Sequence, residues 1–93
     1  MNRAVERWRS ADDVAFESAG DEVVALNLRT GEYYRLNAVA GEIWRRLLRP
    51  RSLAEIAAHL LQRYDVPRKT LASDLSELMG DLERHGLVAR ERS

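Results

Sequence analysis

The chain has 93 residues, with fifteen Lys and Arg against fifteen Asp and Glu, and no cysteine. Its length suits one small domain, and its zero net charge argues against a dedicated binder of nucleic acid or membrane surface. Disulfides and thiolate metal sites are excluded, and no apolar run is long enough for a membrane span or a signal peptide. We therefore expect a single cytoplasmic domain over residues 1–93.

Both ends of the chain are charged. Val5 and Trp8 are the only large apolar side chains that follow the first methionine within residues 1–10. Segments of this kind bury little apolar surface, so we expect residues 1–10 to be a loose tail and residues 89–93 a second tail. Trp8 is the one side chain able to pin the first tail to the body.

Three segments near the start of the chain alternate as β-strands do, and they predict a three-stranded antiparallel meander over residues 14–17, 23–28 and 32–36. The second segment places Val24, Leu26 and Leu28 on one face. The loop before the third segment ends in Gly31, and glycine enters the left-handed region cheaply. If the strand order follows the sequence, the third strand lies at an edge of the sheet.

Three amphipathic helices are predicted next, over residues 38–49, 52–64 and 68–85. Asn37 is placed to cap the first, and Pro50 ends it. Ser52 and Glu55 have the spacing of a capping box. Gly86 follows the third helix, where a terminating glycine is expected.

The order β-β-β-α-α-α indicates an α+β fold that is like a winged helix-turn-helix with its sheet placed first. The chain turns into a helix directly after Leu36. The last strand therefore keeps one edge open, either as a hazard or as a docking site for another extended chain.

Catalytic chemistry has little support. The histidines His59 and His85 lie on separate predicted helices, and we expect both to face solvent or to cap. There are too few His and Cys residues for a metal site, and the five glycines are scattered rather than clustered in a phosphate loop. The prediction is a protein without catalytic residues, metal or cofactor, and not an enzyme.

DNA binding remains the alternative function, because the last helix of a helix-turn-helix usually enters the major groove. The charges oppose it, since residues 68–85 carry four anions (Asp74, Glu77, Asp81, Glu83) and three cations (Arg68, Lys69, Arg84). An acidic helix is repelled by phosphates.

One basic cluster stands out at the end of the first helix, where Arg45, Arg46, Arg49 and Arg51 fall within seven residues. Cations are favoured at a helix C-terminus, so a solvated helix end explains the cluster. The alternative is a patch that docks an acidic peptide or an enzyme partner.

The sequence resembles the PqqD family from about residue 14 to residue 88. Residues 23–37 read VVALNLRTGEYYRLN and are followed by GEIW at 41–44, SLAEIA at 52–57, Tyr64, Asp74-Leu75 and Leu82…Gly86-Leu-Val88. Domains of this family are leader-peptide recognition elements for ribosomally made, post-translationally modified peptides. The residues around Tyr33 and the Tyr-Asp-Val-Pro loop at 64–67 are most similar to the stand-alone leader-binding subunit of lasso-peptide systems.

The resemblance implies a precursor leader peptide as ligand, and a separate leader peptidase and a cyclase as partners, with no role for nucleic acid or membrane. It implies that the leader adds as a strand to the third strand, in a groove against the third helix. It favours the Asp74 side of that helix. The leader contacts implied are Tyr33, Tyr34, Arg35, Leu36, Leu71, Asp74, Leu75 and Leu78. A homodimer that pairs its own open edges is the competing use of the strand.

Overall fold

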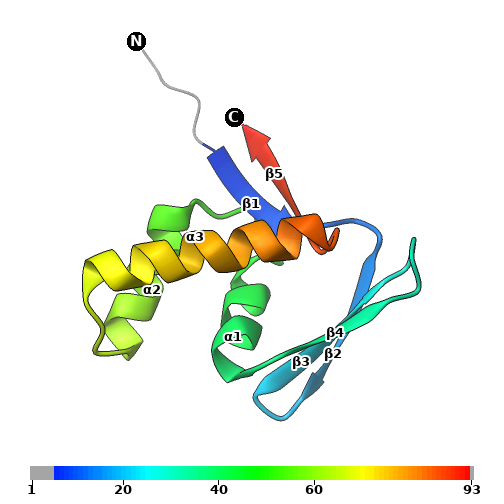
Figure 1. The fold of residues 1–93 in the computed structure, drawn as a ribbon, viewed down its shortest axis with the longest axis horizontal. Helices are drawn as coiled ribbons and strands as arrows, with labels where there is room; N and C mark the ends of the chain where they lie inside the picture. Colours follow the sequence, from blue (N-terminus) through cyan, green and yellow to red (C-terminus); the bar gives the residue numbers. More distant parts are fainter. Residues whose placement is uncertain (1–5, 93) are drawn as a thin grey trace.

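The computed structural model describes residues 6–92, apart from the side chain of Arg92. Five strands and three helices follow one another along the chain (Figure 1). Their bounds are β1 Glu6–Ser10, β2 Val14–Ala19, β3 Glu22–Asn27, β4 Tyr33–Leu36, α1 Ala38–Arg46, α2 Leu53–Arg63, α3 Arg68–Arg84 and β5 Val88–Arg92. The predicted α+β order of a three-stranded sheet followed by three helices is confirmed.

The three-stranded sheet is antiparallel and has the predicted order β2-β3-β4. Gly31 has a φ of +79° in the β3–β4 loop, and its N–H donates to the Asn27 carbonyl oxygen at 2.8 Å. The face that β3 buries is opposite to the apolar face predicted from the sequence. Val23 and Ala25 are fully buried beneath the helices, with Asn27 beside them, while Leu28 lies beyond the strand and is exposed.

The expectation of two tails is wrong for the described residues. β1 and β5 pair antiparallel in a second sheet, with Trp8 opposite Arg90. The Trp8 ring is buried, and the Arg90 guanidinium lies over it at 4.5 Å. The backbone of Trp8 also exchanges two hydrogen bonds with Arg51. These contacts stabilise β1 and β5 as strands, although both segments are mostly polar. Residues 1–5 and 93 of the expected tails lie outside the described residues.

The helix boundaries follow from their caps. The Asn37 side chain accepts from the Ala40 N–H at 2.9 Å, and Ser52 with Glu55 forms the predicted capping box. At the end of α3, the Leu87 N–H bonds the Leu82 carbonyl and the Gly86 N–H bonds the Glu83 carbonyl, which is a Schellman closure. α1 ends at Arg46, three residues before the predicted end.

The early end of α1 has a tertiary cause. The Leu48 N–H bonds the Arg45 carbonyl rather than that of Trp44, so the last turn tightens, and the Leu47 carbonyl accepts from the Ser10 N–H of β1 at 2.7 Å, which ties the end of the helix to that strand. α1 crosses β3 closely at Gly41, where an added Cβ would lie 3.0 Å from the Asp21 carbonyl oxygen. Trp44 and Leu47 are fully buried in this contact.

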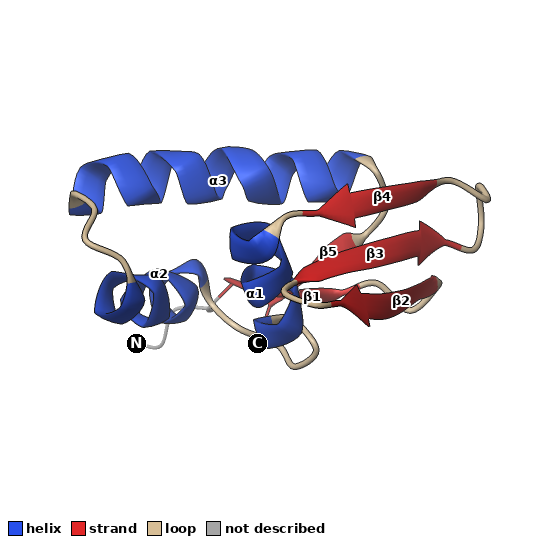
Figure 2. Ribbon diagram, turned by 90° about the horizontal axis from the view of Figure 1, so that it is seen from below, coloured by secondary structure: helices blue, strands red, loops and turns tan. Residues whose placement is uncertain are grey.

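The core lies between the inner face of the three-stranded sheet and the helices. α3 lies over α2 and α1, and only its C-terminal end reaches the open side of β4, as Figure 2 shows. Leu75, Met79 and Leu82 are its buried residues. Leu71 and Leu78, which the sequence places in the same buried line, are only half-buried. Two leucines of α3 are thus left partly accessible to solvent. No helix within residues 6–92 has the length and apolar character to cross a bilayer.

Candidate functional site

The edge of β4 that faces away from β3 has no strand beside it in the described part of the chain. The Asn27 N–H donates to the Glu32 carbonyl oxygen at 2.8 Å, and the register continues as Ala25 opposite Tyr34. Hydrogen-bonded pairs alternate along an antiparallel ladder. The peptide groups of Tyr34 therefore point to β3, and those of Tyr33 and Arg35 point to the open edge.

The side chains of β4 divide between the two faces of the sheet. Tyr34 and Leu36 face inward, and Leu36 is buried. The Tyr34 ring lies 4.6 Å from the ring of His85, and its hydroxyl group donates to Glu32. Partial burial and the nearby Glu32 charge raise the pKa of Tyr34. The Tyr33 side chain is 73% exposed. Successive strand residues face opposite sides of a sheet, so Tyr34 packs inward and Tyr33 lies in solvent.

An apolar hollow of about 230 Å³ lies between the three helices, and the β4 end of α1 contributes Val39 to its lining. The predicted contacts Leu71, Asp74, Leu75 and Leu78 all line it. The hollow is therefore on the Asp74 side of α3, the side that the resemblance favours. Asp74 is the one charged residue in its lining. We call this space the leader hollow below.

Five lining residues of the leader hollow are not among the contacts predicted from the sequence: Val39, Ile43, Leu60, Tyr64 and Val66. Val39 and Ile43 have a helical spacing that places them on one apolar face, which the sequence assigns to the core. Val39 and Val66 are in fact exposed. An apolar stripe does not distinguish a residue that faces the core from one that lines a groove. Only the placement of α3 over α1 makes that distinction.

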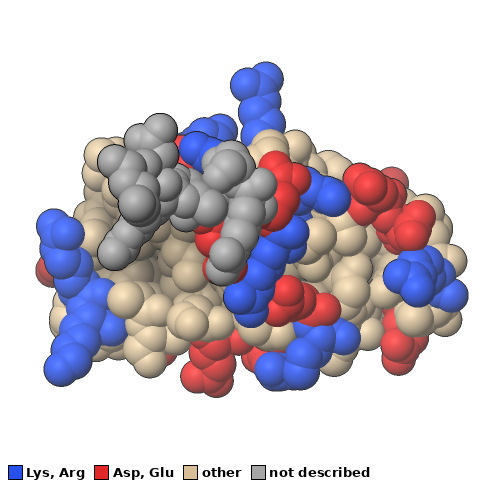
Figure 3. Space-filling view, turned by 90° about the horizontal axis from the view of Figure 1, so that it is seen from above, with Lys and Arg blue, Asp and Glu red and all other residues tan. Residues whose placement is uncertain are grey.

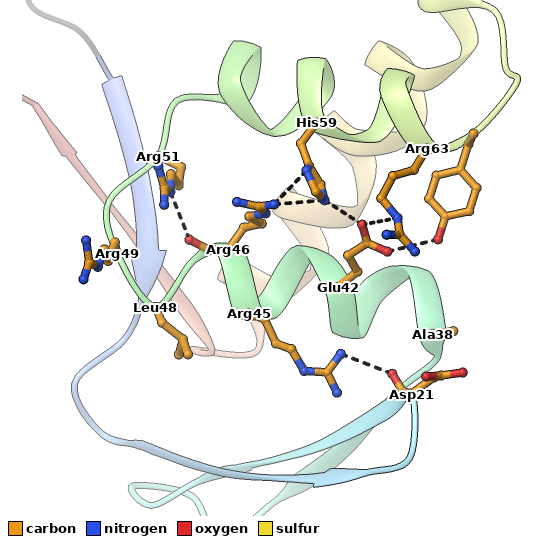
Figure 4. Close-up of a pocket in the computed structure, with 11 residues that line it drawn as sticks. Asp21, Ala38, Glu42, Arg45, Arg46, Leu48, Arg49, Arg51, His59 and Arg63 are labelled. Atoms are coloured by element: carbon orange, nitrogen blue, oxygen red, sulfur yellow. Dashed lines mark hydrogen bonds and ion pairs between the residues drawn. The ribbon is translucent and has the colours of Figure 1, made fainter.

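A second hollow, of about 700 Å³, lies between α1 and α2 on another side of α1 (Figure 4). It contains the predicted partner patch, Arg45, Arg46 and Arg49, together with Arg51 and Arg63. We call it the arginine pocket. Tyr64 lines both hollows, so the two are neighbours separated by one aromatic ring.

Glu42 is the centre of a hydrogen-bonded group in the arginine pocket. Its carboxylate lies 2.6 Å from His59 Nε2 and 2.8 Å from Arg63 Nε, and it accepts from the Tyr64 hydroxyl group at 3.1 Å. Burial disfavours the charged form, but the bonds from His59 and Tyr64 and the charge of Arg63 outweigh burial and lower the pKa of Glu42. The carboxylate is held ionised.

The prediction that His59 faces solvent or caps a helix is wrong. His59 is partly buried between Glu42 and Arg46, whose Nη2 lies 2.8 Å from His59 Nδ1. A carboxylate only accepts and a guanidinium only donates, so Nε2 carries the proton and Nδ1 accepts. His85 is the C-cap of α3, in agreement with its predicted role.

Within residues 6–92, no group of three or more His, Cys, Asp or Glu side chains is placed to hold a metal ion. His59 is a bridge between an arginine and a carboxylate, and neither contact brings it beside a nucleophile. An open strand edge, an apolar hollow and a positively charged pocket are features of ligand-binding surfaces.

The comparisons with known proteins agree with this geometry. The family model described as "Coenzyme PQQ synthesis protein D (PqqD)" matches residues 22–88. The solved structure "TbiB1 in Complex with the TbiA(beta) Leader Peptide" is 34% identical, covers 86% of this chain and 93% of its own, and has a TM-score of 0.82. "Lasso peptide synthetase B1 complexed with the leader peptide" is 30% identical, with 88% and 96% covered and a TM-score of 0.79.

The search of curated proteins found no match. The family model nevertheless spans all elements from β3 to the start of β5, and both solved structures cover most of the chain. The chain belongs to the PqqD family.

Proposed function

We propose that this chain captures the leader of a ribosomally synthesised precursor peptide and delivers it to a separate leader peptidase or modifying enzyme, in lasso-peptide biosynthesis. It acts as a binding module, without a catalytic step of its own. The leader adds as an antiparallel strand to β4 and lies against α3. The contacts are Tyr33, Tyr34, Arg35, Leu36, Leu71, Asp74, Leu75 and Leu78.

The observation that carries the proposal is the open edge of β4, whose chain continues directly into α1, where Val39 and Ile43 line the leader hollow. Strand addition uses the peptide groups of Tyr33 and Arg35, whose hydrogen bonds are indifferent to the leader's sequence. Selectivity then comes from the side chains that enter the hollow. The two solved relatives, each in complex with a leader peptide, support this use of the fold.

The leader hollow favours an apolar anchor. Its half-buried leucines, Leu71 and Leu78, are already partly removed from water, and an apolar leader side chain completes their burial. Asp74 is placed at this lining to accept a hydrogen bond from a leader hydroxyl or amide group. A module of this kind binds with about −8 to −12 kcal/mol, which is micromolar to nanomolar.

The DNA-binding alternative gains no support from α3. Asp74, Glu77 and Asp81 lie together along a shallow hollow on its surface, where a recognition helix would need cations. On the face drawn in Figure 3, acidic and basic side chains are interspersed. Extended phosphate backbones need a continuous basic surface, and this face does not offer one.

The test is calorimetric titration of the protein with leader peptides of lasso precursors, beginning with the TbiA(beta) leader that the solved relative binds. We expect one site, and a loss of at least about tenfold in affinity for Asp74→Ala, as for the removal of one hydrogen bond to a charged group. Asp13→Ala removes a carboxylate from the turn before β2, away from the groove, and is the matched control. No binding to the unmodified protein would overturn the proposed function. Equal affinity of the folded Asp74→Ala protein would overturn the assigned side of α3.

A further inference from the structure

The arginine pocket concentrates positive charge in a chain whose net charge is zero. Five arginines line it, against the two carboxylates of Asp21 and Glu42. They come from three parts of the chain: Arg45 and Arg46 from the last turn of α1, Arg49 and Arg51 from the connection that follows, and Arg63 from the end of α2. If these arginines only complemented the dipole at the end of α1, Arg63 of the neighbouring helix α2 would not be expected among them.

Within residues 6–92, two of the five arginines pair with a carboxylate, Arg63 with Glu42 and Arg51 with Glu55, and the other three do not. Glu42 is already engaged by His59, Arg63 and Tyr64. Arg46 contacts only the ring of His59 through its guanidinium group, and Arg49 has no hydrogen bond or ion pair within residues 6–92. Both therefore retain donors for an external acceptor.

Several of these arginines are also held in place. Arg45 Nη2 lies 3.2 Å from Ser18 Oγ, and its guanidinium also approaches main-chain carbonyls of the β2–β3 turn. Arg63 is fixed by Glu42, and Arg51 Nε reaches the Arg46 carbonyl. Figure 4 shows Arg63 between α1 and α2, Arg51 at the connection of these helices, and Arg45 on the other side of α1, pointing to Asp21. Because partners within the chain already hold these side chains, they lose less conformational entropy when a ligand docks.

We propose that the arginine pocket docks an acidic segment of a protein partner. Guanidinium groups bind carboxylates through paired hydrogen bonds, and several of them converge here. The lining also contains the exposed Leu48 and the ring of Tyr64. Arginine together with aromatic and apolar side chains is the composition of a protein–protein interface rather than of a phosphate-binding surface.

The place of the pocket indicates which partner it serves. Tyr64 lines both the pocket and the leader hollow, so a protein docked on the arginines lies next to the leader. The partner is then the protein that receives the captured leader, a step that rests on the proposed function. Docking of an acidic segment does not rest on it, because the pocket is complete without a leader.

The probe is a fluorescein-labelled octaglutamate peptide, followed by fluorescence anisotropy at low ionic strength. The double variant Arg46→Glu/Arg49→Glu is compared with Arg29→Glu/Lys69→Glu, which makes the same change in net charge outside the pocket. We expect binding to the unmodified protein that weakens with salt, and affinity at least about tenfold lower for the first variant only. Absence of binding, or equal losses in both variants, would overturn the proposal.

Two further measurements distinguish the docking of an acidic segment from nucleic-acid binding and from loss of folding. A DNA duplex that binds the pocket more tightly than octaglutamate, and is released by the same double variant, would assign the site to nucleic acid and overturn the proposal. Arg49→Glu alone is the folding control, because Arg49 has no interaction within residues 6–92, and it should weaken octaglutamate binding without changing thermal stability. Leader titration of the double variant should be unchanged, so a failed leader experiment and a failed docking experiment are distinguishable.

Discussion

The hydroxyl group of Tyr64 lies 3.1 Å from a carboxylate oxygen of Glu42, and this bond joins the two hollows of the molecule. The Tyr64 ring lines the leader hollow, while Glu42 organises His59 and Arg63 in the arginine pocket. Tyr64 thus presents its ring to the proposed leader site and its hydroxyl group to the proposed partner surface.

Replacing Tyr64 by Phe removes that bond and keeps the ring. We expect the free energy of unfolding to fall by about 0.5–1.5 kcal/mol, the usual net value of one hydrogen bond. Urea denaturation at pH 7 measures it. A variant as stable as the unmodified protein would show that the bond contributes nothing, because no other contact changes.

Glu42→Gln tests the charge of the carboxylate at nearly constant shape. The folded state lowers the pKa of Glu42 below the ordinary 4.5, so the unfolded chain binds the extra proton first as the pH falls. Its stabilisation is complete above about pH 4.5 and is lost as the pH falls through the lower folded value. We expect Glu42→Gln to cost about 1–3 kcal/mol at pH 7.

The pH series supplies the control for Glu42. Urea midpoints of both proteins, measured from pH 3 to pH 7, should converge at the acid end as the native carboxylate protonates. A gap of constant size over the whole range would mean that the substitution acts through packing and not through charge.

Asn27 and Gly86 join the β3–β4 hairpin to the end of α3. Asn27 Nδ2 donates to the His85 carbonyl at 2.9 Å, and a Cβ added at Gly86 would lie 2.7 Å from that nitrogen. Gly86 also has a φ of +71°. Gly86→Ala should therefore cost more than the roughly 1–2 kcal/mol of a left-handed alanine. Gly20→Ala, at φ +66° with open space around it, is the matched control, and an equal loss in both would argue against the steric contact.

Arg35→Pro tests strand addition directly. Proline removes the Arg35 N–H, which points to the open edge, and an edge strand tolerates this loss. We expect a folded protein whose leader affinity falls at least about tenfold, since a backbone hydrogen bond and its geometry are lost. Arg35→Ala removes only the exposed ion pair with Glu22, and its effect should stay within about threefold. If the alanine variant loses as much affinity as the proline variant, the side chain is the contact, not the backbone.

Local signals in the sequence predicted much of this fold. Asn37, the Ser52–Glu55 capping box and the Gly86 closure each depend on residues a few positions apart, and all three are confirmed. The open edge at β4 followed from the same kind of evidence, because Asn37 starts a helix directly after Leu36.

The remaining fold depends on contacts that local patterns do not contain. β1 and β5 pair across about eighty residues, and their strand character comes from each other and from the burial of Trp8. The buried face of β3 was missed for a different reason. Both faces carry apolar residues, and the buried one includes Asn27, whose side-chain oxygen accepts from Arg29 and Thr30. Alternation alone leaves such a strand ambiguous.

The site was predictable to a similar extent. The sequence and the resemblance named the α3 residues that the hollow contains, Leu71, Asp74, Leu75 and Leu78. They did not reveal that Val39 and Val66 are exposed beside them, nor that Arg63 of α2 joins the basic cluster of Arg45, Arg46, Arg49 and Arg51. Both facts depend on how two helices meet, which no single periodic pattern encodes.

Hydrogen exchange of the β4 amides, followed by NMR with and without saturating leader peptide, tests the central claim most directly. The N–H groups of Tyr33 and Arg35 point to the open edge, so leader addition should slow their exchange at least about tenfold. The amides of Tyr34 and Leu36 already bond to β3 and should be slow in both states. Leader binding that leaves the exchange of Tyr33 and Arg35 unchanged would contradict capture by strand addition.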